Sequence, residues 1–166
     1  HYFHLSMHDP LTDLPNRRYF SERIKEATTT ANGSAKPFYV FYLDLDQFKH
    51  INNSAGPSVG DYLLRSVAGR LRSVVGEQGV LARFGGDEFS VLSTTCASQA
   101  EAMELAKALI DALEPPFVSM SQSYYLSTCI GISAFPDDGK DAEVLIKNTE
   151  TALYTAKDSG RKSFCF

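Results

Sequence analysis

Two adjacent carboxylates follow a pair of glycines in the stretch VLARFGGDEFSVL, residues 80–92. Gly85 and Gly86 lie between two apolar runs, which predicts a β-hairpin with a two-residue turn whose residues need positive φ angles. Asp87 and Glu88 come directly after these glycines. Because glycine has no side chain, such a turn also allows the phosphates of a ligand to approach the backbone closely. The stretch therefore predicts acidic side chains beside a tight turn, where they are available for chemistry.

Two further acids, Asp44 and Asp46, end the apolar run FYVFYLDLD. An acid at the end of a buried strand is poorly solvated and needs a cationic partner. If this strand and the hairpin are neighbours, their carboxylates converge and repel one another unless a metal ion neutralises them. Carboxylate oxygens favour Mg²⁺ or Mn²⁺, and Mg²⁺ usually also holds substrate phosphates. The pattern predicts a nucleoside triphosphate site; the alternative is that these acids are solvated side chains near turns, which are common.

The elements that must position these residues follow from the apolar pattern. Residues 9–31 predict a turn and then a helix with Asn16 as its N-cap and with Phe20, Ile24 and Ala27 on one stripe. Residues 37–46 are typical of a central strand that is buried on both faces. Residues 47–61 predict a short helix and a loop that contains glycine and proline, and residues 62–75 predict an amphipathic helix. The apolar face of that helix comprises Leu63, Leu64, Val67, Leu71 and Val74.

The rest of the chain adds two helices and two strands to the hairpin. Residues 98–115 predict a helix, residues 124–136 a long strand, residues 141–160 a helix that ends at Gly160, and residues 163–166 a final strand. The inward side chains of the first of these helices are Met103, Ala106, Ile110 and Leu113. Because helices and strands do not alternate as regular βαβ units, we expect the α+β class. One mixed, mostly antiparallel central sheet would be flanked by helices in a single domain.

Length and composition exclude several classes of protein. The 166 residues allow one domain with a sizeable core, and the net charge of −4 offers no broad basic surface for nucleic acid or an anionic membrane. No apolar run is long enough to span a bilayer, and no signal peptide is visible. Cys96, Cys129 and Cys165 are widely spaced, which fits reduced thiols better than a disulfide framework. We expect the domain to lie in the cytoplasm. This expectation holds whether or not the full-length protein is anchored to a membrane.

The sequence resembles the GGDEF domains of the diguanylate cyclase family. The signature stands intact at Gly85–Phe89, directly after Arg83-Phe84. The segments DPLTDLPNRRYF, LDLDQFKHINNSAGPSVGD and ALYTAKDSGR resemble the other motifs of the family in order and spacing. Four ordered motifs, which cover nearly the whole chain, are far more specific than one pentapeptide. The resemblance implies the nucleotidyl cyclase catalytic fold, which is ferredoxin-like, with residues 1–8 ending a linker helix and residues 9–166 forming the domain.

The resemblance assigns the acids to metal binding and proton transfer. Asp44 would bind Mg²⁺ or Mn²⁺ through its carboxylate, Leu45 through its backbone carbonyl, and Asp87 through its carboxylate. Asp87 would also be the candidate proton acceptor, and Glu88 would assist the metal site or the base. Lys49 would neutralise charge that develops during phosphoryl transfer.

The resemblance also implies a set of residues that bind GTP. They are Phe48 and Lys49 over the phosphates, Asn52 and Asp61 at guanine, Gly85 and Gly86 in the turn, and Lys157 and Arg161 at the β- and γ-phosphates. A carboxylate at Asp61 accepts hydrogen bonds from guanine N1–H and N2–H₂, a pair that adenine lacks, so the site should select guanine. Taken alone, each residue has a plainer interpretation: Asp61 as a helix N-cap, Lys157 as a cation near a helix C-terminus, and Asn52 as a turn residue.

The activity that the resemblance implies is the condensation of two GTP molecules into cyclic di-GMP, a bacterial second messenger, with release of pyrophosphate. Each domain would hold one GTP, so turnover would require a homodimer with two-fold symmetry. A fused sensor module upstream would control this pairing. The alternative is a catalytically silent GTP-binding module that regulates an attached cyclic di-GMP phosphodiesterase domain. We expect no contact of this domain with nucleic acid or membrane.

Three features of the sequence depart from the family pattern. Pro57 stands where the guanine loop often has histidine, which removes a side-chain donor and a backbone N–H. Asn53 stands where aspartate is common, and we expect little effect. Many members carry Arg-x-x-Asp five residues before the signature and bind product there; here Gly76–Gly79 read GEQG. We therefore predict no product inhibition through that site.

Overall fold

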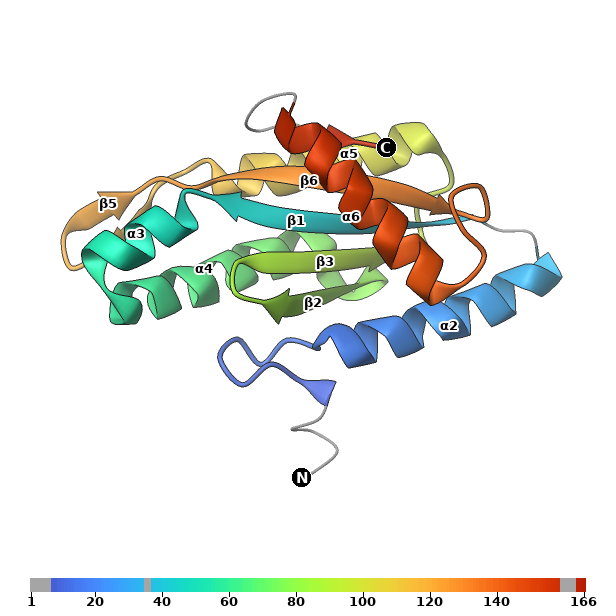
Figure 1. Cartoon of the computed structure of the whole chain (residues 1–166), viewed down its shortest axis with the longest axis horizontal. Coiled ribbons are helices and arrows are strands. Elements are labelled where there is room, and N and C mark those ends of the chain that lie inside the picture. The colour runs from blue at the N-terminus through green and yellow to red at the C-terminus, as the bar shows by residue number, and fades with distance from the viewer. Residues whose placement is uncertain (1–6, 35–36, 159–163) are drawn as a thin grey trace.

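The computed structural model describes residues 7–34, 37–158 and 164–166, which form one layered α+β unit (Figure 1). The helices are α2 Arg17–Ser34, α3 Phe48–Ala55, α4 Pro57–Val75, the short 3₁₀-helix η1 Gly76–Gln78, α5 Gln99–Leu113 and α6 Ala142–Asp158. The strands are β1 Phe38–Asp46, β2 Gly79–Gly85, β3 Glu88–Ser93, β4 Phe117–Ser119, β5 Gln122–Tyr124, β6 Ser127–Phe135 and β7 Phe164–Cys165. Within these residues, no helix is both long and apolar enough to cross a membrane.

The central sheet has five strands in the order β2-β3-β1-β6-β7. β1 lies in the middle and pairs antiparallel with β3 and β6, β2 pairs antiparallel with β3, and β7 runs parallel to β6. The predicted mixed, mostly antiparallel sheet is therefore confirmed. Its middle strand is the apolar run that ends in Asp44 and Asp46, so the acids emerge from the centre of the sheet.

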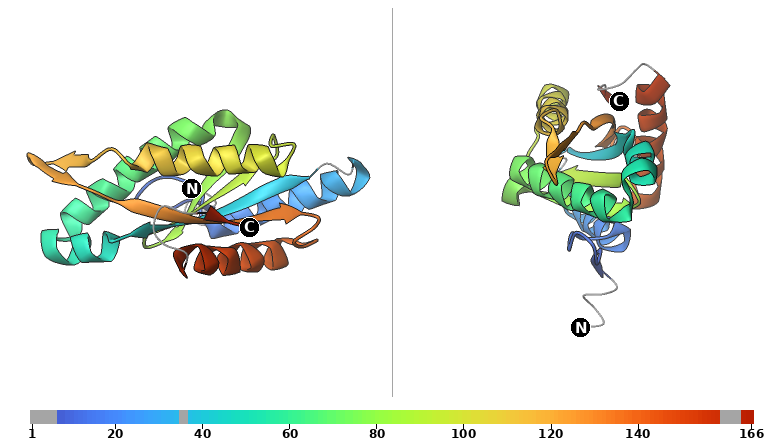
Figure 2. Two further views of the ribbon diagram at one scale, coloured as in Figure 1. Left: turned by 90° about the horizontal axis from the view of Figure 1, so that it is seen from above. Right: turned by 90° about the vertical axis from the view of Figure 1, so that its left-hand side faces the viewer.

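Helices cover both faces of the sheet (Figure 2, left). Phe41 and Leu43 of β1 pack on the side of α4 and α5, whereas Val40 and Tyr42 pack on the side of α2 and α6. This alternation follows from the two-residue period of a strand and explains why β1 is apolar without interruption. The two-sided burial that was predicted for residues 37–46 is confirmed.

Helix α2 begins as predicted. The Asn16 side-chain oxygen accepts a hydrogen bond from the Tyr19 backbone N–H at 3.1 Å, which is the expected N-cap. Phe20 and Ile24 are fully buried against the sheet, and Ala27 is half-buried. The three cysteines are not joined in disulfides: two are buried and Cys165 is half-buried.

The predicted loop before the second amphipathic helix is wrong. α3 ends at Ala55, and α4 begins with Pro57 in its first turn; a single residue, Gly56 with φ of 99°, separates the two helices. Proline suits this position because the first N–H groups of a helix have no intrahelical acceptor and its φ is already helical. Asp61 therefore lies inside α4, and its interpretation as an N-cap is wrong.

One inward side chain that was predicted is wrong. Met103 of α5 is 41% exposed, and its neighbour Ala102 is buried instead. The other predicted positions of α5 are buried, namely Ala106, Ile110 and Leu113. Val74 of α4 is half-buried and packs against the core. Because Ala102 and Met103 are both apolar, spacing alone does not decide which of them faces inward.

A second, two-stranded sheet was not predicted. β4 and β5 pair antiparallel and extend away from the main sheet at the left end of Figure 1. Met120 and Ser121 form their turn with φ angles of 51° and 66°. Positive φ usually marks glycine or asparagine, so this turn carried no recognisable sequence signal. The predicted helix stop at Gly160 lies outside the described residues.

Candidate active site

The register of the sheet brings the acids of two distant segments together. β1 and β3 are neighbours, and Asp44 lies directly opposite Glu88. The Leu45 backbone N–H donates a hydrogen bond of 3.2 Å to the backbone carbonyl of Asp87. The acids at the end of β1 and at the tip of the hairpin therefore share one end of the sheet, as their convergence required.

The hairpin turn is displaced by one residue from its predicted place. Gly85 pairs with Glu88, so Gly86 and Asp87 form the two-residue turn. A register shift between Arg83 and Gly85 marks a bulge that uses one residue of β2. Both glycines have positive φ, 137° at Gly85 and 49° at Gly86. The requirement for glycine is confirmed, and the turn itself carries Asp87.

The acids perturb one another. Burial, the negative charge of Asp44 and a hydrogen bond to its carboxylate raise the pKa of Asp87 to about 6. Burial and Asp44 also raise the pKa of Glu88, while a hydrogen bond with the Tyr42 side chain opposes that shift. Asp44 Oδ1 is buried and accepts no hydrogen bond from an N–H or hydroxyl donor. A cluster of this kind is stabilised by a cation.

The donor set fits a divalent metal only in part. No group of three or more His, Cys, Asp or Glu side chains in the described chain is arranged to hold a metal. Mg²⁺, however, is commonly bound by one or two carboxylates, with water and substrate phosphates completing its shell. Asp44 and Asp87 supply two such carboxylates, and the unpartnered Asp44 Oδ1 is a suitable ligand atom. The residues present therefore fit a metal that arrives with a nucleotide.

Lys157 extends the site onto α6. Its ammonium forms an ion pair with Asp44 Oδ2, and its side chain lines a small pocket with Asp44, Glu88, Glu150, Leu153 and Tyr154. Burial alone would lower the pKa of Lys157, but the hydrogen bond to Asp44 and the nearby carboxylates raise it. The lysine is thus charged and lies among the acids. Arg161, which was predicted to act with it, lies outside the described residues.

The predicted guanine residues lie on two adjoining helices. Asn52 of α3 contacts α4 at Gly60: a Cβ atom at that glycine would lie 2.0 Å from Asn52 Oδ1. Asp61 is the next residue of α4 and is exposed. Gly60 thus allows the amide of Asn52 to lie close to the backbone beside Asp61.

The predicted phosphate residues Phe48 and Lys49 begin α3, directly after β1. Phe48 is buried in the core, whereas Lys49 is exposed. Gln47 precedes them with φ of 68° and provides no side-chain cap. The first N–H groups of such a helix favour an anion.

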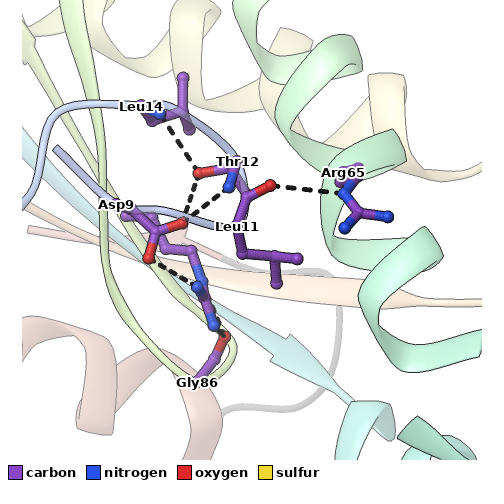
Figure 3. A network of polar contacts seen from close by, with 7 residues as sticks. Asp9, Leu11, Thr12, Leu14, Arg65 and Gly86 are labelled. Carbon is purple, nitrogen blue, oxygen red and sulfur yellow. Dashed lines mark hydrogen bonds and ion pairs between the residues drawn. The ribbon is translucent and has the colours of Figure 1, made fainter. Parts of the chain in front are cut away.

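Arg83, which sequence reasoning did not single out, holds the turn in place through Asp9 and Gly86, the two partners that Figure 3 labels. Arg83 Nη2 and Nε donate to the Gly86 carbonyl at 2.9 and 3.2 Å, and Nη1 pairs with Asp9 Oδ1 at 2.7 Å. Asp9 in turn accepts hydrogen bonds from the backbone N–H and hydroxyl of Thr12 at 2.9 and 2.8 Å. The side chains of Arg83 and Asp9 are only 11% and 12% exposed. The segment before α2 is therefore tied to the turn that carries Asp87.

Comparison with known proteins places this arrangement in a family. The family model "Diguanylate cyclase, GGDEF domain" matches residues 6–163. The chain is 40% identical over 98% of its length to the bifunctional diguanylate cyclase/cyclic di-GMP phosphodiesterase MucR of Pseudomonas aeruginosa, and 36% identical over 96% to the diguanylate cyclase TpbB of that organism. It is 41% identical over 95% to the cyclic di-GMP phosphodiesterase PdeR of Escherichia coli. It spans only 24%, 37% and 23% of these three relatives.

Solved structures of GGDEF domains have the same fold as this chain. The GGDEF domain of TpbB superposes with a TM-score of 0.90 at 36% identity, covering 94% of this chain and 91% of that one. A sensory box/GGDEF family protein of Caulobacter crescentus gives a TM-score of 0.89 at 41% identity, covering 93% and 99%. The motifs, the acidic hairpin and the sheet order thus agree with the match over most of the chain, and the chain belongs to the GGDEF family of diguanylate cyclase domains.

Proposed function

We propose that this domain condenses two molecules of GTP into cyclic di-GMP and releases pyrophosphate. The observation that carries the proposal is the convergence of Asp44, Asp87 and Glu88 at one end of the sheet, with an unpartnered carboxylate oxygen. Such a site suits phosphoryl transfer, in which a protein mainly positions the reactants and neutralises charge. Family membership supports the same reaction.

The carboxylates of Asp44 and Asp87 and the Leu45 carbonyl would hold Mg²⁺ or Mn²⁺. When bound, the metal supplies charge that polarises the α-phosphate and lowers the pKa of the attacking hydroxyl. The ribose 3′-oxygen of one GTP forms a bond to the α-phosphorus of the other, and the bond to pyrophosphate breaks. Asp87, with Glu88 beside it, accepts the hydroxyl proton. In a second condensation the roles of the two nucleotides are exchanged. The 3′-oxygen of the second attacks the α-phosphorus of the first, which releases the second pyrophosphate and closes the ring.

The remaining residues bind and orient the nucleotide. Lys49, Lys157 and Arg161 neutralise the β- and γ-phosphates, and the uncapped start of α3 at Phe48 approaches the same groups. Gly85 and Gly86 allow the phosphates to reach the backbone of the hairpin.

Guanine recognition falls to α3 and α4. Asn52 and Asp61 match the hydrogen-bonding edge of guanine, and a mismatched base would leave their polar groups unpaired. Pro57 contributes no side-chain donor there. Because it begins a helix, its missing N–H leaves no helical hydrogen bond unmade.

One domain holds one GTP, so turnover requires two copies in two-fold symmetry. The relatives are several times longer than this chain, which supports a fused sensor module upstream and a phosphodiesterase domain downstream. We take residues 9–166 as the domain and place it in the cytoplasm. Most of the linker segment predicted over residues 1–8 lies outside the described residues.

A second function is favoured by relatives that are named as phosphodiesterases. PdeR is 41% identical but is named for phosphodiesterase activity alone. In a protein of that kind, the present domain would bind GTP without turnover and regulate an attached phosphodiesterase domain.

The two functions are separated by chromatography of the nucleotides formed from GTP with Mg²⁺ or Mn²⁺. We expect cyclic di-GMP from the native domain and none from Asp44→Asn or Asp87→Ala. The exposed acid Asp111 on α5 provides a control, and Asp111→Asn should retain activity. Tight GTP binding without product, even after forced dimerisation by a fused coiled coil, would establish the regulatory function instead.

A further inference from the structure

Lys157 occupies the carboxylate that the metal would need. Its ammonium pairs with Asp44 Oδ2, although the two residues are 113 positions apart and lie on α6 and β1. The Asp44 side chain is 15% exposed and that of Lys157 is 36% exposed, so the contact is partly shielded from water. We propose that Lys157 is the resident counter-ion of this acidic cluster, which a divalent cation must displace from Asp44. This inference rests on the proposed function because it concerns the same site.

The charges around the pocket explain why a counter-ion is needed. Asp44, Glu88 and Glu150 line it, and Lys157 is the one cationic side chain among its described lining residues. Asp46 and Asp87 also act on the lysine. Without a cation these carboxylates would repel one another at short range, where screening by water is weakened.

A single ammonium neutralises the site incompletely. It contacts Oδ2, while Asp44 Oδ1 remains buried without a donor. A divalent ion carries twice the charge and binds carboxylate oxygen at about 2.1 Å, which is closer than an ammonium hydrogen bond allows. An ammonium on Oδ2 and a metal ion on Oδ1 would lie close together on one carboxylate and repel each other strongly.

Displacement would couple the metal to the nucleotide. A metal that binds alone must break the charge-assisted hydrogen bond of Lys157 and leave the ammonium near another cation. A metal that arrives with GTP brings phosphates that receive the displaced ammonium. The free metal should therefore bind weakly, whereas the metal–nucleotide complex binds well.

Binding of Mn²⁺ to the nucleotide-free domain, followed by the electron paramagnetic resonance of free Mn²⁺, tests this inference. We expect Lys157→Met to bind Mn²⁺ roughly tenfold to a hundredfold more tightly than the native domain, as loss of one competing charge-assisted hydrogen bond implies. Lys147→Met changes an exposed lysine of the same helix and should leave the affinity unchanged. Lys157→Arg keeps the charge and should bind Mn²⁺ as weakly as the native domain.

Further variants locate the ion and the nucleotide. Asp44→Asn in the Lys157→Met background should abolish the tightened binding. With 3′-deoxy-GTP, which lacks the reactive hydroxyl, Lys157→Met should bind the metal–nucleotide complex more weakly than the native domain. Unchanged or weaker Mn²⁺ binding by Lys157→Met, or tight binding that survives Asp44→Asn, would overturn the inference.

None of these measurements needs turnover. If the domain forms no cyclic di-GMP, the proposed cyclase activity is refuted. The Mn²⁺ affinities then still decide whether Lys157 is the counter-ion of Asp44. An active cyclase with unchanged Mn²⁺ binding in Lys157→Met would refute the inference alone.

Discussion

Gly60→Ala should weaken GTP binding without unfolding the domain. The added Cβ would lie 2.0 Å from Oδ1 and 3.0 Å from Cγ of Asn52, which is far inside van der Waals contact. The contacted atoms belong to the end of a side chain, so Asn52 can rotate away while α3 and α4 stay in place. The rotation would remove the amide from the guanine position that we assign to it.

The expected size of the effect follows from the hydrogen bonds lost. One or two net hydrogen bonds are worth about 0.5–1.5 kcal/mol each, which corresponds to roughly a 2- to 150-fold loss of affinity. Alanine in a helix interior also gains up to about 1 kcal/mol over glycine. The melting temperature should therefore not fall, although the affinity does.

Gly69→Ala is the matched control for this change. Gly69 lies in the same helix, and a Cβ there would meet nothing within 4 Å. Calorimetry with 3′-deoxy-GTP should show weaker binding for Gly60→Ala and native binding for Gly69→Ala. Native affinity in Gly60→Ala would refute the assignment of Asn52 to guanine.

Three further predictions concern the hairpin and its surroundings. Burial and Asp44 raise the pKa of Asp87 from 3.8 to about 6. Protonation of Asp87 therefore stabilises the metal-free domain. This stabilisation is complete below pH 3.8 and is lost as the pH rises through 6. Asp87→Asn should thus raise the melting temperature at pH 8 and leave it nearly unchanged at pH 3.5; a lower value at pH 8 would contradict the like-charge cluster. Arg83→Gln leaves Asp9 and the Gly86 carbonyl without their partner and should cost about 2–4 kcal/mol in urea unfolding, whereas a cost below about 0.5 kcal/mol, typical of surface changes, would show that the clamp is unimportant. Micromolar cyclic di-GMP should leave the initial rate unchanged because Gly76–Gly79 lack the arginine and aspartate of the product site; clear non-competitive inhibition would refute this.

Local patterns predicted the elements of the site well. The unbroken apolar run of β1 indicated a central strand, and the glycine pair indicated a tight turn. The prediction that Asp44 and Glu88 lie close together then required only one further assumption. That assumption, that the strands are neighbours, is confirmed by the register. Asn16 as an N-cap rested on similar short-range chemistry.

Features that depend on tertiary contacts were not predictable. The pairing of Asp9 with Arg83 joins residues 74 positions apart, and neither residue type identifies the other in advance. The bulge that moved the turn to Gly86 and Asp87 depends on the pairing of β2 with β3. The ion pair of Lys157 with Asp44 likewise follows from the packing of α6 on the sheet, which the helical pattern of α6 does not encode.

The rate of cyclic di-GMP formation as a function of protein concentration tests the central proposal most directly. We expect the rate to rise more steeply than linearly at low concentration, because two domains must meet, and to vanish in Asp87→Ala at every concentration. GTP binding with no product across the whole range, including with dimerisation forced, would contradict a cyclase. The acidic hairpin would then hold metal and nucleotide for regulation.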